Sequence, residues 1–385
     1  MKKYLKCIIA VAFVLSCFNP IMEAKRKNAE ILNTDPEFFM TEEARRIGDQ
    51  VILYQRVTGG WPKNIDMARP LDEKDAARVL DEKKRRNDST TDNNSTTIQM
   101  AYLARLYKAT GDVKYRDAFR RGVDFLLSGQ YKNGGWPQFW PENRGYQIHI
   151  TYNDNAMVNT MNVIRDLMYG NAPYDRDSDL LTPDYRKRLF ESFYRGVECI
   201  LATQIVDRNG NLTVWCQQHY RDTYVPAPAR AYELPSYCSA ESTGILALLM
   251  EIPEPDYRIK RAVHSGMRWL DDHKITGYRC KRVNKNGFSD TRFVSEPGAG
   301  PVWARFYDLV YAEPYVCDRD GIPRRHLDQI GYERRNGYSW YNNGPARLYD
   351  IYKKWCDKWD PCNAEGISLS SPGGNERGIM LLDRE

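Results

Sequence analysis

Apolar residues recur at helical spacing along most of the chain. In STTIQMAYLARLYKATG they occupy positions 98, 102, 103, 106 and 107, and Gly111 follows the run. This spacing is typical of an amphipathic helix that buries one face. Thr41, followed by Glu42 and Glu43, fits the residues preferred where a helix begins. The pattern predicts helices over 41–55, 95–111, 112–129, 153–170, 182–204, 239–252, 255–275, 303–311 and 345–359.

A weak internal repeat follows these helices. QRVTGGWP, QYKNGGWP and QIVDRNGNLTVW each place a Gln where a helix ends, before a turn that contains Gly and Trp. Their glycines, Gly59, Gly134 and Gly210, are 75 and 76 residues apart. That spacing accommodates two helices and a long loop, and such units bury their apolar faces by packing side by side. The repeat predicts an all-α fold, an α/α toroid of helical hairpins, with its long loops forming a cleft at one end.

A single domain over 25–385 is expected, because no Gly/Ser/Pro-rich linker interrupts the helical series. Alternation typical of strands is scarce, so we expect only short strands near the loops. The charged stretch 72–88 is interpreted as a solvated excursion between repeat units.

The first 24 residues resemble an export signal. Three Lys precede an apolar run from Cys7 to Phe18, which is too short to span a membrane and is typical of a secretory signal. Cleavage after Ala24 is one outcome. The stretch VLSC also resembles a lipoprotein box, which would make Cys17 a lipid-anchored N-terminus. Either outcome predicts a periplasmic or extracellular protein, and no other run is long enough for a transmembrane helix.

Composition narrows the class of partner. The chain has 385 residues, 42% of them hydrophobic and 28% charged, as expected of a folded soluble protein. Its net charge of +5 comes without a dense Lys/Arg stripe, so nucleic acid is not an expected partner. The mild positive charge favours an acidic substrate. We expect a monomer.

Two loops carry a Trp on a Gly-Gly turn, TGGWPKN (58–64) and NGGWPQFWP (133–141). A rigidly held indole offers a flat face to a sugar ring, which makes Trp61 and Trp136 candidate substrate-binding residues. The alternative is that each Trp packs over the end of its own helical hairpin. Lys63 is either a partner for a substrate carboxylate or an ordinary surface lysine.

Asp and Asn cluster where two helices are expected to begin, in TDNNSTTIQM (91–100) and TYNDNAM (151–157). Helix capping explains one such residue, but one cap uses only one side chain. The remaining carboxylate and amide oxygens are hard ligands that suit calcium. Asp92 and Asp154 are therefore candidate metal ligands, and Asn155 is a candidate substrate contact.

Prolines 226, 228 and 235 enclose a loop, VPAPARAYELPSYCSAEST (225–243), that holds Arg230 and Glu233. Proline restricts the backbone, and an arginine on a stiff loop can orient a carboxylate through two hydrogen bonds. Both residues are candidate site residues, and a purely structural Arg–Glu pair is the alternative. Arg305 in GPVWARFYDL is a similar candidate. Metalloprotease, GxSxG, P-loop and dinucleotide signatures are absent.

Seven blocks resemble, in order, the signature blocks of pectate lyases of polysaccharide lyase family 10: TGGWPKN, DNNSTT, NGGWPQFWP, HITYNDNAMVN, VWCQQH, ARAYELPS and GPVWARFYDL. The resemblance implies an α/α toroid that cleaves polygalacturonate by calcium-dependent β-elimination. It implies that Arg230 is the catalytic base and Asp154 a calcium ligand. Asp92 falls on the carboxylate that completes the metal site when substrate is bound. Arg305 and Lys63 resemble substrate contacts.

The implied chemistry is physically consistent. Calcium on the galacturonate carboxylate acidifies the C5 proton, a base removes it, and the C4 oxygen leaves to give a 4,5-unsaturated product. Arginine is an unusual base because its pKa exceeds about 12. A neutral Arg230 therefore needs nearby cations, a dry site or high pH, which predicts an alkaline optimum.

Two other functions fit parts of the sequence. An inverting glycoside hydrolase on the same toroid would use Asp92 and Asp154 as acid and base, about 6.5–9.5 Å apart. A non-catalytic pectin-binding surface protein would need only the aromatic loops, but it would leave the stiff arginine loop unexplained.

Overall fold

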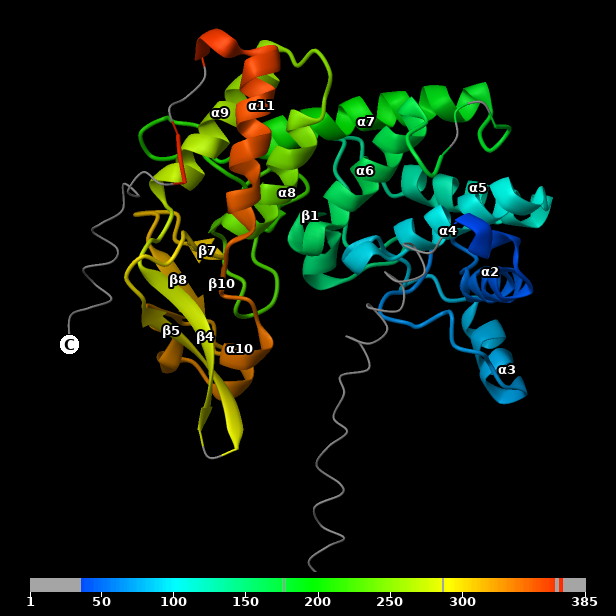
Figure 1. Cartoon of the computed structure of the whole chain (residues 1–385), viewed down its shortest axis with the longest axis horizontal. Coiled ribbons are helices and arrows are strands. Elements are labelled where there is room, and N and C mark those ends of the chain that lie inside the picture. The colour runs from blue at the N-terminus through cyan, green and yellow to red at the C-terminus, as the bar shows by residue number, and fades with distance from the viewer. Residues whose placement is uncertain (1–35, 175, 177, 286, 364–366, 370–385) are drawn as a thin grey trace, which may run out of the picture. The chain divides into compact units, whose positions relative to one another are not determined.

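The computed structural model describes residues 36–174, 176, 178–285, 287–363 and 367–369 (Figure 1). The predicted export signal and Cys17 lie outside the described residues. The α-helices are α2 Glu42–Tyr54, α3 Glu73–Glu82, α4 Thr97–Thr110, α5 Val113–Ser128, α6 Ala156–Tyr169, α7 Pro183–Thr203, α8 Ser239–Met250, α9 Tyr257–Asp272, α10 Tyr332–Gly337 and α11 Leu348–Trp359. No helix in these ranges is long and apolar enough to cross a membrane.

The strands are short apart from one hairpin. They are β1 Ile150–Thr151, β2 Gln218–His219, β3 Tyr237–Cys238, β4 Tyr278–Lys285, β5 Phe288–Ser295, β6 Trp303–Ala304, β7 Phe306–Tyr307, β8 Pro314–Cys317, β9 Pro323–Arg324 and β10 Tyr341–Asn342. Strands β3, β7, β8 and β9 form one sheet in the order β3-β7-β8-β9, and β1–β2, β6–β10 and β4–β5 are two-stranded and antiparallel.

The predicted helices are present with one exception. Thr41 caps α2 by accepting a hydrogen bond from the Ala44 backbone N–H at 3.2 Å, as the sequence indicated. The predicted helix over 303–311 is wrong, because β6 and β7 lie there. Every residue of these two strands is buried, so both faces carry apolar residues. The segment therefore lacks the division into a buried and a solvent-exposed face that identifies an amphipathic helix.

Two further elements differ from the expectation. The charged stretch 72–88 contains helix α3, whose N-cap Asp72 accepts from the Asp75 N–H at 2.7 Å. The eight-residue strands of the β4–β5 hairpin were not predicted. Basic and apolar side chains are mixed along β4, YRCKRVNK, so its sequence shows little alternation between a wet and a dry face.

The repeated glutamine joins successive repeats. The Nε2 of Gln55 donates to the Gly59 carbonyl in its own loop at 2.8 Å and to the Ala118 carbonyl of α5 at 2.9 Å. Gln130 does the same with Gly134 and with Ser192 of α7, at 3.0 and 2.8 Å.

The third glutamine follows the same rule. Gln204 donates to Thr213 in its loop at 2.8 Å and to Ala262 of α9 at 3.0 Å. The repeat seen in the sequence is therefore a structural repeat, in which one buried side chain ties a loop to the next helical hairpin.

The chain divides into two compact units. Unit 1 is Met1–Leu126 with Gly170–Leu181, and within it α2 packs on α4. Unit 2 is Leu127–Tyr169 with Thr182–Glu385, and within it α6 packs on α7, and α8 packs on α6, α9 and α11. Helix α8 is buried along nearly its whole length, which suits its sequence SAESTGILALLM.

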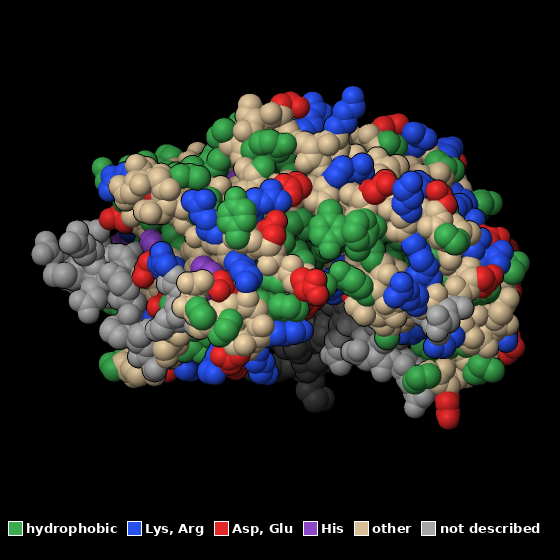
Figure 2. All heavy atoms as spheres, turned by 90° about the horizontal axis from the view of Figure 1, so that it is seen from above, with side chains coloured by type: hydrophobic (Ala, Val, Ile, Leu, Met, Phe, Trp, Pro, Cys, Tyr) green, Lys and Arg blue, Asp and Glu red, His purple; other side chains and the backbone are tan. Residues whose placement is uncertain are grey.

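Charges of both signs share the surface. On the face shown in Figure 2, Lys and Arg side chains are interspersed with Asp and Glu. This mixture agrees with the mild net charge of +5.

A matched pair of glycine substitutions tests the repeat. Gly134 has φ +90°, and a Cβ there would lie 1.9 Å from the Arg195 carbonyl oxygen. Gly210 has φ +85° with nothing within 4 Å of such a Cβ. Both alanine variants should lose ~1 kcal/mol to the unfavourable backbone angle. Gly134→Ala should lose about 2 kcal/mol more, because its loop must move away from α7.

The free energies of unfolding of the two variants, measured in urea, check this expectation. Equal losses would show that the loop does not depend on the close approach of Gly134 to α7.

Candidate active site

Two short 3₁₀ turns carry the Asp/Asn clusters, η2 Asp92–Asn94 and η4 Asn153–Asn155. In η2 the second and third residues, Asn93 and Asn94, have φ of 55° and 62°. In η4 the corresponding values are 51° for Asp154 and 59° for Asn155. Asn and Asp adopt this left-handed conformation more readily than other non-glycine residues.

The two turns therefore correspond residue by residue, in a register that the sequence did not reveal. By position in its turn, Asp92 matches Asn153, and both are buried. Asp154 matches Asn93. The backbone conformation also explains why both clusters hold more Asn and Asp than one helix cap requires.

In unit 1, Asp92 pairs with Lys63. The Lys63 Nζ lies 2.5 Å from Asp92 Oδ2, and the Asp92 carboxylate is fully buried. The Lys63 side chain is partly exposed. The sequence selected both residues separately, and the structure brings them together as one ion pair.

In unit 2, Asp154 lies beside Arg305. Asp154 exposes 36% of its side chain, and its Oδ1 is 3.8 Å from Arg305 Nη2. Arg305 is buried, and the same Nη2 donates to Asn153 Oδ1 at 2.9 Å and to Glu241 Oε1 of α8. Burial opposes the charge on Arg305, but Glu241, Tyr338, Cys238 and Asp154 together outweigh it, so the pKa of Arg305 lies well above its ordinary value.

Asn155 packs against α8. A Cβ on Gly244 would lie 2.4 Å from Asn155 Oδ1. That oxygen is buried and has no hydrogen-bond partner among the described residues. The side-chain oxygen of Asn155 is therefore covered in this structure. The exposed side-chain oxygens of the turn belong to Asp154.

Arg230 forms a close pair with Glu233 on the proline-bounded loop. Its Nε donates to Glu233 Oε2 at 2.7 Å, its Nη2 donates to Oε1, and its backbone N–H donates to Oε2 at 3.1 Å. The Arg230 side chain is 37% exposed, whereas Glu233 is fully buried. Burial opposes the charge on Arg230, but Glu233 outweighs it and raises the pKa of Arg230 above its ordinary value.

Tyr338 links the two Arg–Glu pairs. Its hydroxyl donates to Glu233 Oε1 at 2.7 Å, and its ring centroid is 4.7 Å from the Arg305 guanidinium carbon. Burial raises the pKa of Tyr338 well above its ordinary value, so the hydroxyl remains protonated and can donate. Unit 2 thus brings Asp154, Arg305 and the Arg230–Glu233 pair into one network.

Sequence reasoning missed three members of this network, Asn153, Glu241 and Tyr338. Asn153 was in a quoted motif, but only its partner Arg305 distinguishes it from its neighbours. Glu241 lies one turn into α8 in a mostly apolar segment, where an acid signals a buried partner. Tyr338 had no distinguishing signal among 26 tyrosines.

The expected sugar-stacking role of Trp61 and Trp136 is not supported by the structure. Both are fully buried. Trp61 Nε1 donates to the Val51 carbonyl of α2 at 2.7 Å, and the equivalent Trp215 donates to Ile200 of α7 at 2.8 Å. These indoles cover the ends of helical hairpins, which was the alternative interpretation, so their faces are not available to a sugar.

The donor set fits a hard cation only in part. Within the described residues, no three His, Cys, Asp or Glu side chains form a group able to hold a metal ion. Asp154 alone offers an exposed carboxylate in its turn, because the side-chain oxygen of Asn153 accepts from Arg305 and that of Asn155 is buried. Such oxygen donors suit calcium, which commonly completes its shell with water and ligand oxygens.

Comparisons with known proteins identify the family of the chain. The family model described as pectic acid lyase matches residues 55–349. The chain belongs to the pectic acid lyase family. Two similar solved structures are a family 10 polysaccharide lyase from Cellvibrio cellulosa and an aspartate-to-alanine mutant of that lyase in complex with trigalacturonic acid. No curated protein matches the chain.

The likeness to these two structures extends over nearly their whole length. The mutant is 34% identical, with a TM-score of 0.72, and the match covers 86% of this chain and 98% of the other. The second is 35% identical, with a TM-score of 0.71, and the match covers 85% and 95%. The resemblance to family 10 and the helical toroid fold class are confirmed, and the protein is a lyase.

The Arg230–Glu233 pair makes stability depend on pH. Burial would raise the pKa of Glu233, but Arg230 outweighs burial and lowers it below the ordinary 4.5. A carboxyl with a lowered pKa stabilises the fold above its unfolded pKa and loses this contribution as the pH falls through its folded pKa. Glu233→Gln should therefore cost about 2 kcal/mol at neutral pH.

The difference between wild type and Glu233→Gln should shrink below about pH 4.5, the ordinary value. Urea unfolding at several pH values measures it, with the exposed Glu42→Gln as a control. A difference that stays constant down to the acid range would show that Glu233 is not held ionised by Arg230.

Proposed function

We propose that this lyase cleaves polygalacturonate by calcium-dependent β-elimination, with Arg230 as the base and Asp154 at the metal site. One observation carries the proposal. An exposed carboxylate, Asp154, and a partly exposed arginine, Arg230, belong to one hydrogen-bonded and cation–π network in unit 2. The similar lyase whose structure contains trigalacturonic acid supports the choice of substrate.

The side chains around Asp154 suit an acidic sugar. Calcium would withdraw charge from the galacturonate carboxylate and so acidify the C5 proton. Asp154 would hold the ion, and the amide of Asn153 keeps Arg305 close to Asp154. Asp92 is proposed as a metal ligand on the sequence resemblance alone, and its buried carboxylate pairs with Lys63 within unit 1.

Arg230 must change partners before it can accept a proton. Its contacts with Glu233 favour the charged form. The reaction therefore requires that Arg230 leave Glu233 and release a proton to solvent before it takes the proton from C5. High pH favours this loss, and another donor to Glu233 would favour the change of partner. The exposed third of the Arg230 side chain allows this movement. Tyr338 retains a hydrogen bond to Glu233 and so helps to satisfy the buried carboxylate when Arg230 moves.

Ultraviolet absorbance tests the reaction class. The mature protein mixed with polygalacturonate and calcium should give rising absorbance, because β-elimination makes a C4–C5 double bond conjugated to the carboxylate. A chelator should abolish the rise, and added calcium should restore it. A neutral galactan, which has no carboxylate, should give no signal.

Other outcomes of this experiment have clear meanings. New reducing ends without absorbance would indicate hydrolysis and contradict the proposal. A rise in absorbance that persists in chelator would support β-elimination but contradict a role for the metal.

Arg230→Lys tests the base. Lysine cannot reproduce the two side-chain contacts that orient the guanidinium on Glu233, and its amine would occupy a different position. The initial rate should fall about 100-fold or more, the usual loss when a proton-transfer group is displaced. The wild-type rate should rise toward alkaline pH.

Arg221→Lys is the matched control, because Arg221 is exposed and pairs only with its neighbour Asp222 among the described acids. An unchanged rate in Arg230→Lys would remove Arg230 from the mechanism.

A further inference from the structure

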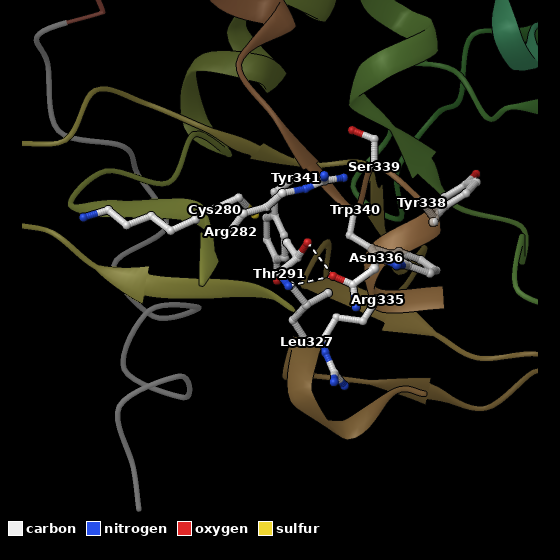
Figure 3. Close-up of a pocket in the computed structure, with 12 residues that line it drawn as sticks. Cys280, Arg282, Thr291, Leu327, Arg335, Asn336, Tyr338, Ser339, Trp340 and Tyr341 are labelled. Carbon is white, nitrogen blue, oxygen red and sulfur yellow. Dashed lines mark hydrogen bonds between the residues drawn. The ribbon is translucent and has the colours of Figure 1, made fainter. Parts of the chain in front are cut away.

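A pocket of about 400 Å³ lies between the β4–β5 hairpin and the segment that follows α10 (Figure 3). Its volume is within the range of about 300–1,000 Å³ that is usual for small-ligand sites. All of its lining residues belong to unit 2. We call it the hairpin pocket. Its lining includes three cationic side chains, Lys281, Arg282 and Arg335, and no acidic one.

Two of these three cationic side chains already pair with acidic residues. Lys281 pairs with Glu296, and Arg335 Nε donates to Asp290 Oδ1 at 2.7 Å. Asp290 and Glu296 are outside the pocket lining. Arg282 is exposed, and its side chain has no ion pair or hydrogen bond in the part of the chain that the structure describes. The pocket therefore offers one guanidinium without an acidic partner, beside two cationic side chains whose charges are balanced by Glu296 and Asp290.

The walls of the pocket are built rigidly. Asn336 Oδ1 accepts from Thr291 N–H at 2.7 Å and from its hydroxyl at 2.9 Å, which fixes α10 to β5 (Figure 3). Tyr341 stacks on Phe293 with ring centroids 4.0 Å apart. Ser339 is exposed, and its hydroxyl has no hydrogen bond within the described ranges. An aromatic wall, a free hydroxyl and a free guanidinium together suit a sugar that carries a carboxylate.

The pocket adjoins the candidate active site. Tyr338 lines it at the side opposite Cys280 and Arg282 (Figure 3). The hydroxyl of the same Tyr338 donates to Glu233, the partner of Arg230. One residue thus borders both the pocket and the proposed base, so a polymer bound at Arg230 has a neighbouring cationic cavity within unit 2.

We propose that the hairpin pocket binds one uronate residue of the polysaccharide, a sugar other than the one that loses its C5 proton. The proposal rests on the proposed function for the identity of the polymer. Arg282 holds the carboxylate and Ser339 contacts a ring hydroxyl. Such remote binding favours long chains over short ones, because a short chain cannot reach both places at once.

Chain-length dependence tests this assignment. The substrates are the shortest oligogalacturonate that the wild-type protein cleaves and one four residues longer. Arg282→Ala should lower kcat/KM on the longer substrate about tenfold, the usual worth of one hydrogen bond to a charged group, and leave the shorter one unchanged. Ser339→Trp should fill the pocket and so should also lower kcat/KM on the longer substrate.

Arg279→Ala is the matched control. Arg279 lies three residues before Arg282 on the same strand, so its side chain is on the opposite face of the hairpin, where it pairs with Glu296 as Lys281 does, and it does not line the pocket. This variant should leave kcat/KM unchanged for both substrates. A loss in Arg282→Ala that is equal for both lengths would place Arg282 at the reacting sugar and overturn the assignment, as would no loss at all.

Calorimetry in chelator separates this proposal from the lyase function, because it measures binding of the longer oligogalacturonate without turnover. If the protein cleaves nothing, yet Arg282→Ala weakens binding about tenfold and Arg279→Ala does not, the pocket stands and the catalytic proposal fails. If cleavage is normal and Arg282→Ala binds as tightly as wild type, the pocket assignment fails alone.

Discussion

The packing of successive helical repeats depends on the hydrogen bonds of one glutamine carboxamide that follows each of α2, α5 and α7. Gln55, Gln130 and Gln204 each satisfy one carbonyl in their own loop and one in the helix of the next repeat. The same side chain thus sets where a loop begins and how the neighbouring helix lies. An apolar residue there would leave two buried carbonyls without donors, a loss that hydrophobic packing does not offset. The buried indoles that follow, such as Trp61 and Trp215, close the apolar end of each hairpin.

The candidate site is held by balanced charges. Arg230 with Glu233 and Arg305 with Glu241 are two arginine–glutamate pairs, and both arginines lie close to the ring of Tyr338. Buried charges are tolerated when paired and hydrogen-bonded, and these pairs satisfy that condition. Arg230 is therefore not a free cation, because any anion that approached it would compete with Glu233.

Most of the helices could be predicted because they bury one face, although α3 and α10 were not predicted. The repeat could be predicted because Gln, Gly and Trp recur at nearly constant spacing. The segment 303–311 could not, because burial on both faces removes the helical stripe. At the site, the Arg230–Glu233 pair was foreseen as an alternative, whereas the partners of Arg305 come from residues 152 and 64 positions away. Contacts over such separations are set by how repeats pack, which no local pattern contains. The burial of Trp61 and Trp136 was similarly invisible, since a Trp on a Gly-Gly turn has the same sequence whether it faces solvent or a hairpin.

The left-handed turns at Asp92–Asn94 and Asn153–Asn155 have a consequence for how substitutions are read. Position 154 is under two independent demands, a backbone at φ 51° and a carboxylate beside Arg305. An alanine there removes the charge and strains the turn at once, so its effect mixes chemistry with conformation. Asparagine keeps the conformational preference and removes only the charge. The immediate neighbours Asn153 and Asn155 supply a built-in reference, because they show that this turn already accepts amides on both sides of the acid.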